Sequence, residues 1–345
     1  NSIFSEIFFK SLNYKKFKFF SVIPYIIASL LKIYPLSLVI IYFIENFKKI
    51  SLLKIIVALV FLTIIYLFFN ELSNLINMLF LVIFLLGLLS DLKLLKIAFM
   101  KLILQFFIIY IIVYIADIHL ISLRVQFLDQ LNENILFNYF FVTFCIVILI
   151  NGTNFIDGLN GLVLGYFAII FSSIYFLDLP NIIFFKEKFP LLLISFSIFF
   201  LFNISNKIFL GDNGSYLLGV FSSISLIQLY NNNNFSPFFI LLLLWYPCFE
   251  LLFSILRKFN FKKSPLEPDI NHFHQLILNF LKLKYKYKNL VCNNLASFLI
   301  LFYNFVIFFV GSIYIYNSEF QILLILLSII IYIFTYLKLH RYIYK

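Results

Sequence analysis

The sequence predicts an all-α protein that crosses a membrane many times, with its site formed by polar connections at one membrane surface. The chain has 345 residues, of which 63% are hydrophobic and only 12% are charged, and its mean hydropathy is +1.05. Soluble domains have about 45–50% apolar and about 25% charged residues. The apolar residues also form long runs separated by short polar stretches. This composition excludes a soluble globular domain.

About eleven apolar runs are suitable for membrane-spanning helices, which need about 20 mostly apolar residues. The runs lie at about residues 19–44, 51–70, 75–90, 97–116, 135–150, 162–178, 190–204, 215–230, 238–256, 290–316 and 320–337. The first run contains Lys32 and Pro35, so we expect it to be tilted, kinked or partly interfacial. We find no second, soluble domain, so we predict one integral-membrane domain over residues 1–345, with its membrane region at 19–340.

The basic residues predict which side of the membrane each connection faces. Lys and Arg outnumber Asp and Glu by 26 to 15, and most of them flank the connections 45–50, 91–96, 205–214 and 257–289 or lie in the C-terminal tail. If each apolar run crosses the membrane once, these connections and the connection 151–161 lie on the same side of the membrane. The positive-inside rule predicts that this side is cytoplasmic. The net charge of +11 therefore indicates topology rather than a nucleic-acid partner. The lysines of the N-terminal tail fall on the other side and do not fit the rule.

The most informative stretch is the polar segment Asn151-Gly-Thr-Asn-Phe-Ile-Asp-Gly-Leu-Asn-Gly161, which lies between two apolar runs. Polar groups at the edge of the hydrocarbon are costly unless they are hydrogen-bonded, hydrated or bound to a ligand. Its three glycines permit turns and the close approach of a ligand. We therefore interpret the segment as part of a catalytic surface that binds a metal and a diphosphate.

Two further acids lie on the same predicted face. Asp91 ends an apolar run, and Asp212 lies in the stretch Phe209-Leu-Gly-Asp-Asn-Gly-Ser215. Taken singly, each of Asp91, Asp157 and Asp212 is explained as well by a turn, a helix cap or an interfacial acid. Three such acids on one face of a chain with 15 acidic residues favour a site. Carboxylate and amide oxygens are the ligands that suit Mg²⁺.

The connection 257–289 adds basic groups that could meet phosphate. It contains Lys262 and Lys263, followed by the pair His272-Phe-His274. His-x-His alone describes a solvated loop or an adventitious metal pair equally well. Its position on the same predicted face as the acids favours a part in the site.

Taken in chain order, three motifs resemble the polyprenyl-phosphate N-acetylhexosamine-1-phosphate transferase superfamily, which is glycosyltransferase family 4. The motifs are Asn151-x-x-Asn154-x-x-Asp157-Gly-Leu-Asn160-Gly-Leu162, Phe209-Leu-Gly-Asp212-Asn-Gly-Ser215 and His272-Phe-His274. The resemblance covers about residues 80–280. Eleven spans are more similar to the undecaprenyl-phosphate N-acetylglucosamine-1-phosphate transferase branch than to the ten-span phospho-N-acetylmuramoyl-pentapeptide transferase branch.

The resemblance implies a reaction, a location and a set of roles. A UDP-sugar, usually a UDP-N-acetylhexosamine, would give its sugar 1-phosphate to undecaprenyl phosphate with Mg²⁺ as cofactor and UMP as the other product. This step would begin a cell-envelope glycan such as cell wall, lipopolysaccharide or O-antigen, at the cytoplasmic face of the inner membrane. The catalytic residues would be Asp91, Asp157, Asp212 and His272, and the metal ligands would be Asp212 and Asn154. The substrate-binding residues would be Asn151, Asn154, Asn160, Gly211, Lys262, Lys263 and His274. The sequence leaves open whether the chain forms a homodimer.

Departures from the family pattern keep other hypotheses open. Ser90 precedes Asp91 where the family has paired aspartates, Asn160 replaces an acid, and Gln275 stands where a further His is common. An inactive homologue that binds lipid phosphate or nucleotide-sugar is therefore a second hypothesis. A transporter is a third, because polar breaks interrupt apolar helices, although polar groups gathered at one face disfavour it.

Overall fold

The computed structural model describes residues 74–177, 179, 181, 183–260 and 271–344. The chain divides into two compact units, residues 1–67 and 68–345, and all of the described residues belong to the second. The predicted runs at 19–44 and 51–70, together with Lys262 and Lys263, lie outside the described residues. The prediction of one domain over the whole chain stays a prediction.

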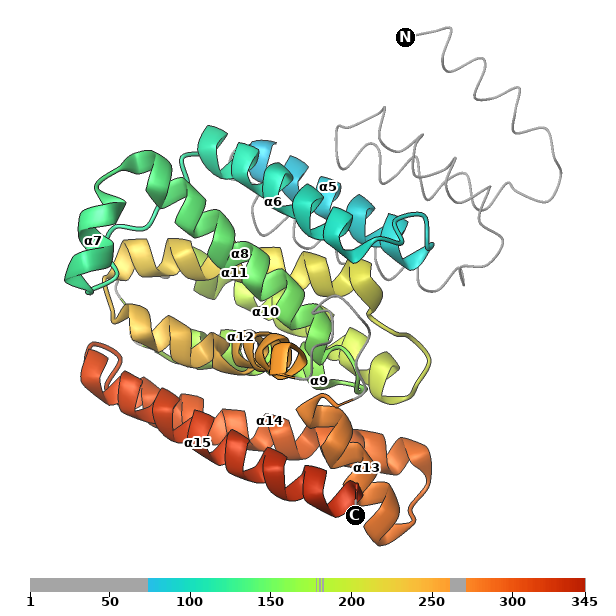
Figure 1. Cartoon of the computed structure of the whole chain (residues 1–345). Coiled ribbons are helices and arrows are strands. Elements are labelled where there is room, and N and C mark those ends of the chain that lie inside the picture. The colour runs from blue at the N-terminus through green and yellow to red at the C-terminus, as the bar shows by residue number, and fades with distance from the viewer. Residues whose placement is uncertain (1–73, 178, 180, 182, 261–270, 345) are drawn as a thin grey trace, which may run out of the picture. The chain divides into compact units, whose positions relative to one another are not determined.

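The described part is entirely helical, as predicted (Figure 1). Its helices are α5 (Asn74–Asp91), α6 (Ala98–Ile115), α7 (Gln126–Asn132), α8 (Ile135–Ile156), α9 (Leu162–Tyr175), α10 (Ile183–Ile204), α11 (Gly211–Asn233), α12 (Pro237–Asn260), α13 (Phe273–Tyr285), α14 (Asn289–Ile313) and α15 (Ser318–Ile343). Each apolar run predicted within this part coincides with one of them. The two short helices α7 and α13 are additional, and α13 lies inside the stretch 257–289 that we treated as a single connection.

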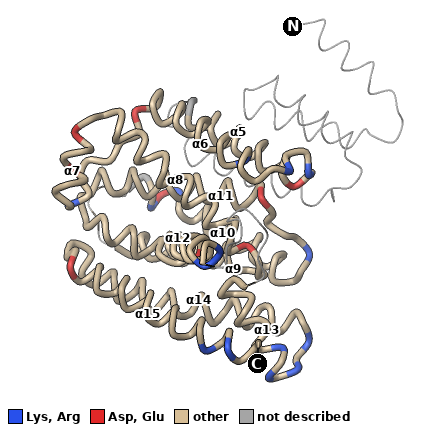
Figure 2. Tube along the Cα trace, in the orientation of Figure 1, with Lys and Arg blue, Asp and Glu red and all other residues tan. Residues whose placement is uncertain are grey.

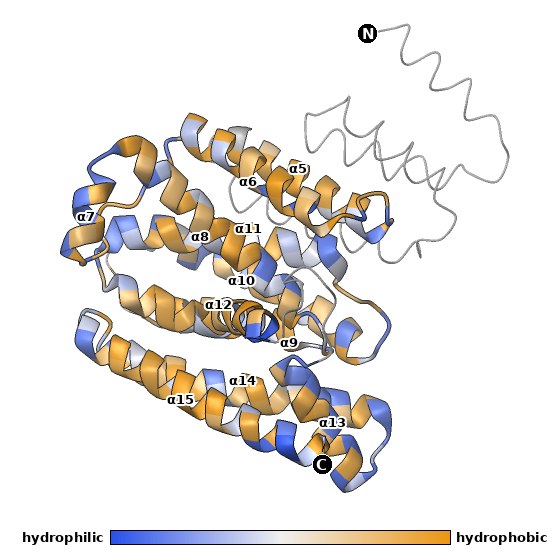
Figure 3. Ribbon diagram, in the orientation of Figure 1, coloured by the Kyte–Doolittle hydropathy of each residue, from blue (hydrophilic) through white to orange (hydrophobic). Residues whose placement is uncertain are grey.

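Six helices of the described part are long and apolar enough to cross a membrane: α6, α8, α10, α12, α14 and α15. Helices α5 and α9 are apolar but shorter, while α11 has 23 residues and includes many Ser and Asn. Apolar residues dominate the helices, and the polar residues gather at their ends and connections (Figure 3). The chain is therefore a polytopic membrane protein, and the count of eleven spans stays a prediction.

Helix α11 is the central helix of the described bundle, and it packs mainly against α5 and α8. Every residue from Ser215 to Ile227 is buried. A helix enclosed on all sides has no solvent face and needs no amphipathic pattern. Of its buried serines, Ser223 donates through Oγ to Gly219 O at 2.7 Å, whereas the hydroxyls of Ser222 and Ser225 have no partner among the described residues.

Glycines allow the neighbouring helices to approach α11 closely. A Cβ atom on Gly219 would lie 2.8 Å from Ile150 Cα of α8, and one on Gly87 of α5 would lie 2.4 Å from Asn213 Cα. Backbone atoms cannot move aside as a flexible side chain can. These two positions therefore set the distances of α5 and α8 from the first half of α11.

The polar segment 151–161 differs in one respect from the expectation. Helix α8 continues to Ile156, so the first half of the segment is helical, and Asp157 is its C-cap. The chain then turns into α9 through Gly161, whose φ of 76° lies in the left-handed region that favours glycine. The helix extends because Asn151 and Asn154 find partners on neighbouring helices, which apolarity alone could not show.

Gly219→Ala should lower the free energy of unfolding by about 1–3 kcal/mol, because the added methyl group forces α8 away from α11. Equilibrium unfolding in mixed detergent micelles measures this change. Ser223→Ala, one turn further along the same helix face, removes only a hydroxyl group bonded to its own helix and should cost less. Equal losses in the two variants would contradict the close-packing role of Gly219.

Candidate active site

The three predicted acids come together at the N-terminus of α11. Asp91 accepts hydrogen bonds from the backbone N–H groups of Asp212 at 2.9 Å and Asn213 at 3.3 Å. Asp157 accepts one from Gly211 N–H at 3.1 Å. The first N–H groups of a helix have no partner within it, and negative charge is favourable there. Asp91 and Asp157 therefore cap the buried helix that carries Asp212.

The side chain of Asp212 contacts two residues from the preceding helices. Its Oδ2 atom accepts a hydrogen bond from Ser90 Oγ and lies 3.4 Å from Lys101 Nζ on α6. We did not predict Lys101 as a site residue, although it is the one charged residue of the apolar run 97–116. A charged residue inside an apolar run indicates a polar partner or a functional site, because an unpaired charge there is costly.

The asparagines of α8 connect this helix to its neighbours. Ser215 Oγ donates to Asn154 Oδ1 at 2.9 Å and to Gly211 O at 2.8 Å, which joins Asn154 to the first turn of α11. One turn earlier, Asn151 Nδ2 donates to Oε1 of the buried Gln105 at 2.8 Å. Asn154 thus lies beside the acids, whereas Asn151 faces α6.

Asn160 has contacts of a different kind. Its backbone N–H donates to Asn293 Oδ1 at 2.7 Å, and its carbonyl accepts from Ser297 Oγ, also at 2.7 Å, so it is tied to α14. Its side chain is buried and donates to Asn206 Oδ1 at 3.4 Å. These contacts join α14 to the connections on either side of α9 and α10. The substrate-binding role of Asn160 remains a prediction.

A buried carboxylate holds the first histidine of the pair. His272 Nδ1 lies 2.9 Å from Glu250 Oε1. Glu250 is fully buried in α12 and also accepts from Phe273 N–H at 3.2 Å and from Tyr332 OH at 2.7 Å. Sequence reasoning missed Glu250, although it is the one charged residue of the run 238–256. Its partner His272 could not be recognised from spacing, because 22 residues separate the two.

The histidine pair joins the segment 151–161. A Cβ atom on Gly158 would lie 2.2 Å from His274 Nε2, so this glycine makes room for the buried imidazole. The His272 ring stacks on that of His274 with 5.6 Å between centroids, and it contacts Phe155 edge-on at 5.3 Å. The predicted convergence of this pair with the residues around Asp157 is therefore observed within the described residues.

Burial controls the protonation of two groups in the site. Burial raises the pKa of Asp157 to about 7, with smaller contributions from the Asp91 and Asp212 carboxylates, while the Gly211 N–H hydrogen bond acts in the opposite direction. Burial lowers the pKa of His274 to about 4. Neither ring nitrogen of His274 has a hydrogen-bond partner among the described residues. A cation bound beside Asp157 would lower its pKa again.

The residues fit Mg²⁺ in kind but do not form a cage around it. Within the described residues no group of three or more His, Cys, Asp or Glu side chains is placed to hold a metal. Mg²⁺ needs no such cage, because it keeps several waters and uses one or two carboxylates together with substrate phosphates. Asp212 and Asn154 offer a carboxylate and an amide oxygen at the first turn of α11. Their role as ligands remains a prediction.

The fold and the site together define a class. This is a helical membrane protein in which acids, a lysine and a histidine pair meet at one end of the described bundle, where Lys and Arg also gather near α13 (Figure 2). Such a cluster is suited to bringing anionic groups together at a membrane surface. By sequence comparison, the sequence model of glycosyl transferase family 4 matches residues 73–230. The matched part contains the first two of the three motifs that resemble this family.

Two curated relatives match over part of their length. A Bacillus subtilis (strain 168) protein named probable undecaprenyl-phosphate N-acetylglucosaminyl 1-phosphate transferase is 31% identical over a 202-residue alignment, and the match covers 50% of this chain and 56% of the relative. A Thermotoga maritima protein named undecaprenyl-phosphate alpha-N-acetylglucosaminyl 1-phosphate transferase is 30% identical over 132 residues, 37% of this chain and 39% of the relative. The matches thus span about half or less of each relative. Both names belong to the branch that the sequence favoured.

Glu250→Leu should lower the free energy of unfolding by about 3 kcal/mol or more, because it leaves three buried donors unpaired. Tyr332→Phe alone should cost about 1 kcal/mol, but little or nothing in the Glu250→Leu background, where its hydroxyl has no acceptor. Unfolding of the two single variants and the double variant in detergent measures this coupling. Tyr336→Phe is the matched control, because its hydroxyl bonds Arg257 and Asn271 instead. Additive losses for Glu250 and Tyr332 would contradict their interaction.

His274 should make the protein less stable as the pH falls. Its pKa is about 4 in the folded state and 6.5 as the reference value, so the unfolded chain takes up the proton first as the pH decreases. The resulting loss of stability between pH 7 and pH 5 is about 2 kcal/mol. Asp157, whose folded pKa is raised, acts in the opposite direction over this range. Comparison of wild type with His274→Gln by unfolding at both pH values isolates the histidine, and equal pH dependence would refute the assignment.

Proposed function

We propose that the protein transfers a sugar 1-phosphate, most simply N-acetylhexosamine 1-phosphate, from a UDP-sugar to undecaprenyl phosphate. The products are a lipid diphosphate-sugar and UMP. The observation that carries the proposal is the meeting of Asp91, Asp157 and Asp212 at the N-terminus of α11. The family match and the names of the relatives support it. The step begins synthesis of a cell-envelope glycan.

The reaction brings negative charges together. An oxygen of the lipid phosphate forms a bond to the β-phosphorus of the UDP-sugar, the bridging bond to the α-phosphate breaks, and UMP leaves with the electron pair. The lipid phosphate is already ionised near neutral pH, so positioning and charge compensation dominate over proton transfer. Lys101 supplies a positive charge beside the acids, and the N-terminus of α11 supplies the positive end of the helix dipole. Lys262 and Lys263, which lie outside the described residues, remain candidate phosphate contacts.

We assign roles to the remaining residues from their positions. Asp212 and Asn154 would hold Mg²⁺, which when bound would neutralise the charge that develops on the phosphate oxygens. Asp91 orients the acceptor phosphate and also fixes the first turn of α11. Asp157 and Gly211 shape the nucleotide-sugar side. For Asn151 and Asn160 this role follows from the motif, because their side chains bond Gln105 and Asn206. His272, held by Glu250, and His274 complete the site beside Gly158.

We further propose that the site faces the cytoplasm in a multi-pass inner-membrane protein. The excess of Lys and Arg at this end of the bundle supports that orientation (Figure 2). UDP-sugars are cytoplasmic substrates in the family that the chain resembles, and this agrees with the charge rule. The lipid acceptor reaches the same surface from within the bilayer.

A second function is favoured by one observation. Ser90 stands where the family has an aspartate, and its hydroxyl donates to the Asp212 carboxylate. With serine in place of aspartate at this position, the acidic cluster has one negative charge fewer. An inactive homologue that binds the nucleotide-sugar without turnover is therefore the alternative.

Purified protein with Mg²⁺, undecaprenyl phosphate and a panel of UDP-sugars should release UMP. Asp212→Asn should reduce this release by about 10²–10³-fold or more, because it removes the metal-binding charge. Asp91→Asn should have a similar effect. Glu319→Gln is the control, since this carboxylate is exposed at the first turn of α15.

The outcomes separate the hypotheses. No UMP with any sugar, while a homologue is active in the same assay, would refute the transferase. Nucleotide-sugar binding without UMP would identify the inactive homologue. Full activity of Asp212→Asn would remove the metal assignment.

A further inference from the structure

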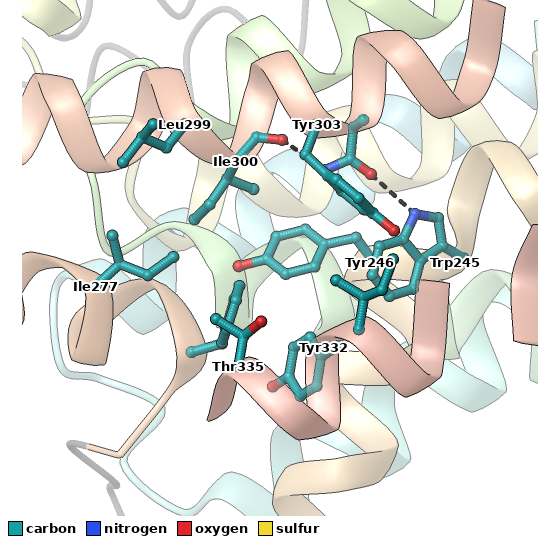
Figure 4. A pocket seen from close by; sticks show the side chains of 11 residues that line it. Trp245, Tyr246, Ile277, Leu299, Ile300, Tyr303, Tyr332 and Thr335 are labelled. Atoms are coloured by element: carbon teal, nitrogen blue, oxygen red, sulfur yellow. Dashed lines mark hydrogen bonds between the residues drawn. The ribbon is translucent and has the colours of Figure 1, made fainter. Parts of the chain in front are cut away.

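A cavity of about 180 Å³ lies between α12, α13, α14 and α15, and none of the acids of the site lines it (Figure 4). Its wall is aromatic and aliphatic, and includes Trp245, Tyr246, Phe273, Ile300 and Tyr332. An apolar cavity of about 150 Å³ stays free of water and accepts apolar guests of benzene size. The cavity therefore has the size and the lining to hold a hydrocarbon segment.

The mouth of the cavity lies among residues that face outward. Leu299 of α14 and Ile331 of α15 line the cavity and are 46% and 39% exposed. Both helices are long and apolar enough to cross a membrane. The medium at these exposed apolar surfaces is then lipid hydrocarbon, which makes a lipid chain the occupant that can enter.

Two buried hydroxyls of the cavity wall, those of Tyr246 and Tyr303, make no hydrogen bond within the described residues. Tyr246 is only 1% exposed. Its ring lies among Ile277, Ile300 and Thr335 (Figure 4). Burial of a hydroxyl without a partner is costly. A ligand with a hydrogen-bond acceptor would satisfy this donor.

Two other polar groups of the wall, those of Trp245 and Tyr332, already have partners. Trp245 Nε1 donates to Asn304 Oδ1 at 2.8 Å, and the Tyr332 hydroxyl donates to Glu250. The Tyr246 and Tyr303 hydroxyls are thus buried donors left for a ligand in the described wall. An apolar chain that carries oxygen acceptors is the chemistry of a fatty-acyl ester.

The cavity adjoins the histidine pair. Phe273, between the two histidines, forms part of the wall, and the wall residue Tyr332 bonds the carboxylate that holds His272. The last turn of α13 carries Lys282 and Lys284, which suit lipid headgroups. A phospholipid bound here would place its head near α13 and one chain in the cavity.

We propose that this cavity binds one acyl chain of a membrane phospholipid, with an ester oxygen accepting a hydrogen bond from Tyr246. The site is separate from the acids and does not depend on the proposed transfer reaction. Through Phe273 and Tyr332 the bound chain contacts the elements that hold the histidine pair.

The single tryptophan of the chain gives a direct test, because it is Trp245. Its side chain is only 6% exposed, yet it lines the cavity. The full-length protein is placed in phosphatidylcholine vesicles whose acyl chains carry bromine at defined positions, and tryptophan fluorescence is recorded. We expect strong quenching that depends on the position of the bromine.

Three variants test the site itself. Ile300→Phe fills the cavity and Leu299→Phe narrows its mouth, so both should lose the quenching. Tyr246→Phe should raise the fraction of brominated lipid needed for half-maximal quenching by about fivefold, the effect of one hydrogen bond. Leu327→Phe adds the same ring to an exposed position of α15 outside the cavity and should leave the quenching unchanged.

Several results would overturn the proposal. These are no quenching by any brominated lipid, or undiminished quenching in folded Ile300→Phe and Leu299→Phe proteins. Relief of quenching by stoichiometric undecaprenyl phosphate would identify a polyprenyl chain as the occupant instead. An unchanged response in Tyr246→Phe would contradict the ester contact. None of these readouts requires UMP release, so failure here and failure of the transferase are distinguishable.

Discussion

The capping of α11 by Asp91 and Asp157 is the interaction on which the rest of the site depends. This helix is enclosed by its neighbours from Ser215 to Ile227, and the N–H groups of its partly exposed first turn have no partner within the helix. Carboxylates from α5 and from the end of α8 satisfy three of these groups. The same contacts fix the place of Asp212. A structural need and a chemical site therefore share the same residues.

The histidine pair depends on a second constraint, the buried carboxylate of Glu250. Its three hydrogen bonds join α12, the start of α13 and α15. The family match ends at residue 230, so this arrangement lies beyond the matched segment. Helix α15 is thus part of the framework of the site, and it also lines the cavity between α12, α13, α14 and α15.

The sequence predicted the helical membrane fold because long apolar runs leave few alternatives in a bilayer. It also identified Asp91, Asp157 and Asp212 as one cluster. If each apolar run crosses the membrane once, the connections that carry these acids lie on the same side. The sequence missed Lys101 and Glu250, the single charges of two apolar runs. Their partners are 111 and 22 residues away, and single-sequence spacing carries no information on such pairs.

The sequence by itself determined the class of protein, the helices and the motifs, because these follow from local composition and order. Only the tertiary structure decided that Asn151 and Asn154 continue α8, that Asn160 is tied to α14, and that Gly158 makes room for His274. Each of these depends on which groups meet across helices, and a polar group inside a membrane protein adopts the position where it finds a partner. The capping of α11 also depends on the tertiary structure. By sequence alone each of the three acids could belong to a separate turn, whereas in the structure they meet at the N-terminus of one helix.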